Sequence, residues 1–163
     1  MDFIRLLEPE RIYCQAAIQS KKRAFEKLAQ LLAHPLIDYD NKQKSASASV
    51  IFSALLQREK LGCTALGQGI AIPHTRAHIP APRAAILTLN EGIDLNAPDK
   101  KPVHTLIALI LPKTVSPRDS DTLHKLILNF AQQAAIKNLQ QFTHAEQMID
   151  YLSTNFCPVL AAA

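Results

Sequence analysis

The stretch ALGQGIAIPHT, residues 65–75, is the most informative part of this chain. Three of the four glycines of the chain lie within residues 62–69, and such a concentration marks tight turns or close approach of another group to the backbone. The apolar run 70–72 predicts a short buried strand that ends at Pro73. We therefore expect His74 in a stiff, half-exposed loop at the carboxyl end of that strand, where chemistry tends to be found in sheets of this kind.

Two more apolar runs follow this stretch, at residues 84–89 and 103–111. Both are rich in leucine and isoleucine and are bounded by proline, asparagine or aspartate, as buried strands are. Together with residues 70–72 they predict a small sheet in the middle of the chain.

Helical patterns lie on both sides of this sheet in the sequence. Ser20 can cap a helix that extends to about residue 33, and a second helix is predicted over residues 47–60 with Gly62 at its end. Arg58 falls in the last turn of this second helix, just before the glycine-rich stretch. The sequence therefore predicts two helices before the glycine-rich stretch.

The last third of the sequence also predicts helices. An apolar stripe begins at Leu123 behind a possible cap at Ser120 or Asp121, and the capping box that starts at Thr143 predicts a final helix to about residue 153. We expect residues 1–163 to form a single α/β domain, with helices on both faces of a small sheet.

Composition excludes several classes of protein. The longest apolar run, 106–111, is far shorter than the roughly 18–20 residues of a membrane helix, and charged residues interrupt the start of the chain as they do not in a secretory signal. The net charge of +4 comes from scattered lysines and arginines, so no nucleic-acid surface is expected. The three cysteines are widely spaced and are read as free thiols. We expect a cytoplasmic protein without membrane insertion.

His74, in the glycine-rich stretch, suits nucleophilic chemistry. A neutral imidazole is nucleophilic near pH 7, and attack on a phosphoryl group needs cationic or N–H donors for the phosphoryl oxygens. Arg58 and the backbone N–H groups around Gly67 and Gly69 are candidates for that role, because side chains at the glycines would keep the oxygens away. The alternative is that His74 is a structural residue, and spacing alone does not decide between the two.

A metal site is a rival interpretation of the same region. His74, His78, His104 and Cys63 are metal-binding residue types. However, the run from Pro73 to Pro80 lacks the apolar stripe of a helix, so the i, i+4 pair is not expected to share a helix face. We expect no metal ion and no other cofactor.

Three segments resemble a known family: QSKKRAFEKLAQLLA at 19–33, REKLGCTALGQGIAIPHTR at 58–76 and KPVHTLIALILP at 101–112. They resemble the enzyme IIA proteins of the fructose/mannitol class in the bacterial phosphoenolpyruvate-dependent phosphotransferase system, and most of all the nitrogen-regulatory enzyme IIA. The resemblance covers roughly residues 4–155. It implies a small mixed β-sheet with helices on both faces.

The resemblance also implies a function, that of a phosphocarrier rather than a stand-alone turnover enzyme. In that family the matching histidine, here His74, accepts a phosphoryl group on Nε2 from the phosphohistidine of an HPr-like protein. Arg58 matches a family active-site arginine. The charged and uncharged forms are then expected to bind regulatory target proteins differently.

One position departs from the family pattern. Relatives usually carry a second active-site histidine at the start of the helix after the KPV strand, where this chain has Asp119. Either His124 serves instead, or Asp119 occupies the site and faces His74, and phosphotransfer would suffer in both cases. Two alternatives to a regulatory phosphocarrier therefore stay open: a binding module that acts without phosphorylation, and a sugar-specific component that passes phosphate to a permease partner.

Overall fold

The computed structural model describes residues 3–34, 47–114 and 117–156. Along this part of the chain, one strand and two α-helices precede a run of five strands, and two further α-helices follow it. The helices are α1 (Lys21–Leu32), α2 (Ala48–Leu61), α3 (Pro117–Gln132) and α4 (Ala145–Asn155), with short 3-10 segments η1 (Phe3–Leu6), η2 (Pro9–Arg11) and η3 (Ala134–Gln141). The strands are β1 (Ile12–Ala16), β2 (Ala65–Gly67), β3 (Ile70–Ala71), β4 (His74–Ala77), β5 (Arg83–Ile93) and β6 (Val103–Pro112).

All six strands belong to one mixed sheet. The order is β1-β5-β6-β3-β2, and β4 also pairs with β6, farther along that strand than β3. Strand β1 runs parallel to β5, β5 runs antiparallel to β6, and both β3 and β4 run parallel to β6. The small mixed sheet expected from the sequence is therefore confirmed.

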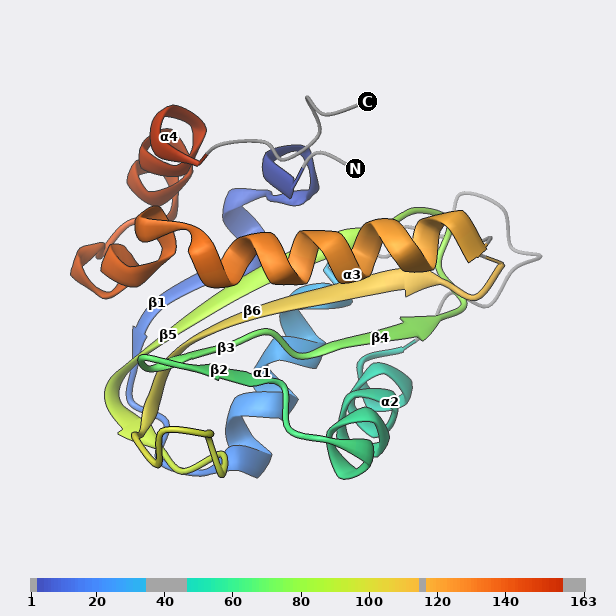
Figure 1. Ribbon diagram of the computed structural model, residues 1–163, viewed down its shortest axis with the longest axis horizontal. Helices are drawn as coiled ribbons and strands as arrows, with labels where there is room; N and C mark the ends of the chain where they lie inside the picture. Colours follow the sequence, from blue (N-terminus) through green and yellow to red (C-terminus); the bar gives the residue numbers. More distant parts are fainter. Residues whose placement is uncertain (1–2, 35–46, 115–116, 157–163) are drawn as a thin grey trace.

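Helices cover both faces of this sheet, as Figure 1 shows. Helices α1 and α2 lie on one face, and α3 and α4 lie on the other. Successive residues of a strand point to opposite faces, so Leu106 of β6 packs in the core with α1 and α2 while Ile107 packs in the core with α3 and α4. The central strands are thus buried on both faces, which explains their continuous apolar sequences.

The predicted caps at Ser20 and Gly62 are confirmed, and those proposed for the last two helices are wrong. Ser20 and Ser47 accept backbone N–H groups at the starts of α1 and α2. Helix α3 begins at Pro117 rather than after Ser120 or Asp121, because proline is well suited to a first helical turn. Helix α4 begins after His144 and has no side-chain cap; the Thr143 hydroxyl is instead hydrogen-bonded to His144 Nδ1, so the predicted capping box does not form.

The loop predicted around His74 is also wrong, because His74 is the first residue of β4. Strands β3 and β4 keep one register against β6: Ile70 lies opposite Thr105, and His74 lies opposite Leu109. Pro73 has no N–H to donate, but its carbonyl still accepts from the Leu109 N–H. Proline therefore interrupts the strand without turning it, and the sheet itself holds the backbone of His74.

Candidate functional site

The glycine-rich stretch forms the turn between β2 and β3. Gly67 and Gly69 both have positive φ, +93° and +79°, which glycine adopts without strain. The Asp99 carboxylate lies beside Gly67 and accepts the Gln68 N–H at 2.7 Å, and the His104 ring occupies the space beside Gly69. These contacts indicate that both glycines serve to form the turn and to let Asp99 and His104 pack against it. The structure does not bring them into the lining of the pocket around His74.

Substitution of Gly69 by alanine is expected to destabilise the fold by about 1–3 kcal/mol, because it puts a β-carbon at positive φ and against the His104 ring. Gly62→Ala is the matched control, since Gly62 has extended backbone (φ 168°) and its β-carbon would meet Arg58 Nη1 at an ordinary 4.0 Å. We expect the control to lie within about 0.5 kcal/mol of the unaltered chain or slightly above it. Urea unfolding of both variants measures the difference, and equal losses would contradict the role of Gly69.

A pocket of about 450 Å³ surrounds His74 between α2, β4 and α3. Helix α2 contributes Gln57, Arg58 and Leu61, and α3 contributes Leu123. Arg58 lies in the last turn of α2, as predicted, and its Nη1 donates to the Gly62 carbonyl at 2.9 Å. The structure thus brings His74 and Arg58, two residues selected from the sequence, to the same pocket.

The His74 ring has a defined orientation. Nδ1 lies 2.8 Å from the Ile72 carbonyl oxygen, which can only accept, so Nδ1 carries the proton and donates it. In a neutral imidazole with a protonated Nδ1, the lone pair available for attack is on Nε2. The backbone two residues upstream therefore selects the nucleophilic nitrogen.

The buried carboxylate of Glu59 supports the orientation of the His74 ring, and the sequence did not predict this role. Glu59 is 7% exposed and accepts from both the Thr64 N–H (3.2 Å) and the Thr64 hydroxyl (2.6 Å). The Thr64 carbonyl in turn accepts the Ile72 N–H at 3.0 Å. Glu59 therefore fixes Thr64, which fixes the residue whose carbonyl orients the His74 ring.

The pKa of His74 is lowered from its ordinary value of 6.5. Burial is the largest cause, and the positive charges of Arg58 and His124 add to it, while the hydrogen bond to Ile72 and the charge of Glu59 act in the opposite direction. At neutral pH the imidazole is therefore uncharged and keeps the lone pair that a nucleophile needs.

A titration followed by NMR is expected to give a midpoint for His74 below that of the same residue in the urea-unfolded chain. Because the unfolded chain then binds a proton more readily, the pKa shift stabilises the fold above about pH 6.5 and this stability is lost as pH falls through the folded pKa. A His74→Gln variant should lose less stability over that range. A folded midpoint above the unfolded one would contradict the cause assigned here.

The two residues near the missing family histidine are placed differently. His124 lies on α3, is exposed, and its charge acts on His74. Asp119 lies in the first turn of α3, but its side chain is outside the described part of the structure. The choice between these two residues therefore stays open.

The described residues contain no group of three or more histidine, cysteine or acidic side chains that could hold a metal ion. Cys63 donates its thiol to the Leu95 carbonyl, and His104 Nδ1 is hydrogen-bonded to Thr105 Oγ1, so each has a local partner away from His74. In the same part of the chain, no helix has the length and apolar character needed to cross a membrane.

Comparison with known proteins identifies the class to which this fold and pocket belong. The model of the family "Phosphoenolpyruvate-dependent sugar phosphotransferase system, EIIA 2" matches residues 5–155, and the chain belongs to that family. It is similar to the nitrogen regulatory protein of Pseudomonas aeruginosa, 36% identical over 123 residues that make up 75% of each chain. It is 32% identical to the nitrogen regulatory protein of Escherichia coli (strain K12) over 145 residues, 88% of this chain and 82% of that one.

Solved structures agree with this assignment. The nitrogen regulatory protein IIA-Ntr from Neisseria meningitidis has a TM-score of 0.75 and 32% identity, and the match covers 91% of this chain and 97% of that one. The IIA mannitol structure from E. coli has a TM-score of 0.66 at 19% identity, covers 90% of this chain and 98% of that one, and shows the shared fold alone. The resemblance to the nitrogen-regulatory enzymes IIA is thereby confirmed.

Proposed function

We propose that this protein is a regulatory phosphocarrier: His74 accepts a phosphoryl group from the phosphohistidine of an HPr-like protein and controls target proteins according to its charge state. The observation that carries the proposal is the His74 ring, whose Nδ1 is committed to the Ile72 carbonyl and whose Nε2 is the nucleophilic nitrogen of a pocket that also contains Arg58. Family membership and the similarity to nitrogen regulatory proteins support it.

The transfer step follows from the same atoms. The Nε2 lone pair of His74 forms a bond to phosphorus as the bond between phosphorus and the donor's imidazole nitrogen breaks, and that electron pair returns to the donor ring. The Nδ1 proton stays on the hydrogen bond to Ile72, so the phosphorylated ring carries one positive charge beside the negative charges of the phosphoryl oxygens. Arg58 faces the charge on the phosphoryl oxygens from the last turn of α2.

The same step gives a means of regulation. A phosphoryl group adds roughly two negative charges to a pocket whose rim includes Leu61, which is 86% exposed. An apolar side chain beside a switchable charge suits a protein interface that is formed in one state and opposed in the other. Target proteins that bind at this rim would therefore bind differently to the phosphorylated and the unphosphorylated forms.

The proposal is tested by incubating the chain with phosphoenolpyruvate, an enzyme I and an HPr-like donor, and measuring its intact mass. We expect a gain of one phosphoryl group that is lost in acid. Omission of the donor is the control, and a relative known to accept phosphate is run beside it. A relative that becomes charged while this chain does not would favour a binding module that acts without phosphorylation.

A further inference from the structure

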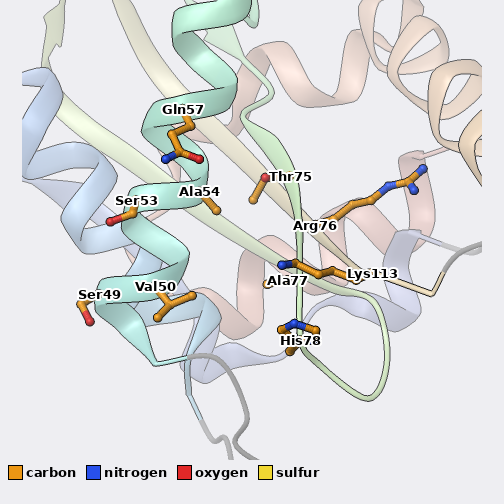
Figure 2. Close-up of a pocket in the computed structure, with 10 residues that line it drawn as sticks. All are labelled: Ser49, Val50, Ser53, Ala54, Gln57, Thr75, Arg76, Ala77, His78 and Lys113. Atoms are coloured by element: carbon orange, nitrogen blue, oxygen red, sulfur yellow. The ribbon is translucent and has the colours of Figure 1, made fainter.

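A second pocket lies beside the one around His74, between α2 and the open edge of β4. Its volume is about 470 Å³, which falls within the range of small-molecule sites. It shares Ala54, Gln57, Thr75 and Arg76 with the His74 pocket but does not include His74 or Arg58. Figure 2 shows α2 as one wall and β4 as the other.

The lining of this second pocket is positively charged and rich in hydrogen-bond donors. Lys113 extends across β4 toward α2, and His78 lies at the end of the strand (Figure 2). The backbone of Lys113 is fixed, because its N–H donates to the Ala77 carbonyl at 3.1 Å. The Thr75 hydroxyl and the Gln57 amide add donors from both walls, and none of the lining residues is acidic.

The rest of the lining limits what can occupy the pocket. Val50 and Ala77 line the pocket with apolar surface near the charged groups. An anion that carries a short carbon skeleton can therefore contact both the charged and the apolar parts of the lining. Val50 belongs to the first turn of α2, where the positive end of the helix dipole favours an anion. The guanidinium of Arg76 points away from α2 in Figure 2.

We propose that the pocket between α2 and β4 binds a small organic phosphate, with Lys113, His78 and Thr75 as donors to the phosphate oxygens. Three donors, two from β4 and the residue after it and one from the residue after β6, match the three oxygens of a phosphomonoester better than the two of a carboxylate. The site is separate from the histidine that we propose to carry the phosphoryl group.

The site also lies close enough to His74 to affect its charging, a consequence that rests on the proposed function. Thr75 follows His74 directly in β4, so a bound phosphate and a phosphorylated His74 would place two dianions near one another. Because like charges repel, each should weaken the other reciprocally. We expect the charged form of the protein to bind the organic phosphate several-fold more weakly than the uncharged form.

The test is a titration of the uncharged protein with glycerol 3-phosphate, followed by the backbone amide NMR signals. We expect the signals of Thr75, Ala77 and Lys113 to shift, and Lys113→Met to weaken binding about ten-fold. Lys137→Met, which removes an exposed lysine of η3, is the matched control and should bind as the unaltered chain does. Because this experiment uses no phosphoryl donor, its result is independent of whether His74 can be charged.

Three outcomes would overturn the proposal. The first is no shift of these signals at millimolar glycerol 3-phosphate, or a shift that glycerol produces equally. The second is binding that Arg58→Gln abolishes and Lys113→Met does not, which would place the phosphate in the His74 pocket. The third is equal affinity for succinate, which would assign the pocket to dianions in general rather than to phosphates.

Discussion

Alanine in place of His74 is expected to abolish phosphoryl acceptance from an HPr-like donor. The side chain is the only proposed nucleophile, and the hydrogen bond from Nδ1 to Ile72 leaves Nε2 as its attacking atom. Removing it takes away the atom to which phosphorus would bond, so the loss should be complete rather than partial. Intact mass after incubation with the donor system measures the result.

His34→Ala is the matched control for this substitution. His34 is an exposed histidine outside the linings of both pockets described above. Its variant should still gain one phosphoryl group. A phosphorylated His74→Ala variant, or an uncharged His34→Ala variant, would contradict the assignment of His74 as the acceptor.

The elements that the sequence predicted well are those defined by local interactions. The helices that follow Ser20 and Ser47 begin where predicted, because a cap and an apolar stripe lie within a few residues of each other in the chain. The strands at residues 84–89 and 103–111 were found because burial on both faces leaves a continuous apolar run. In both cases the signal and the structure occupy the same segment.

The features that were missed depend on distant pairing. Nothing within residues 74–77 shows that this segment continues along β6 past Pro73, since the pairing partner begins at Leu109. The role of Glu59 was missed for a related reason: a glutamate in a last helical turn resembles a solvated surface residue until the chain folds back and presents Thr64 to it. A threonine five residues after a glutamate is too common a pattern to have revealed it.

The candidate site was predicted only in part, because some of its contacts join segments that lie far apart in the sequence. Arg58 and His74 were selected from the sequence, and the structure places both in one pocket. Gly67 and Gly69 were selected by proximity in sequence, but a turn needs glycines as much as a phosphate site does. Their actual neighbours, Asp99 and His104, lie more than thirty residues away in the chain, beyond the reach of a local pattern.

Replacing Arg58 by glutamine is expected to slow phosphorylation of His74 by about 10²–10³-fold while leaving the fold intact. The guanidinium is the cation of α2 in the His74 pocket, and its hydrogen bond to the Gly62 carbonyl is exposed to solvent. Loss of that bond should cost little stability, because exposed interactions of this kind contribute little. Single-turnover transfer from the charged donor measures the rate, and thermal unfolding verifies the fold.

Lys60→Gln is the control that separates a local effect from a general loss of charge. Lys60 lies in the same last turn of α2 and is exposed, so its removal changes the net charge by the same amount without emptying the pocket. Arg58→Lys should recover part of the rate, because an ammonium supplies charge but not the planar fork of donors. If Arg58→Gln and Lys60→Gln slowed transfer equally, the arginine would act through donor docking, and the charge on the phosphoryl oxygens would have to be stabilised from α3 instead.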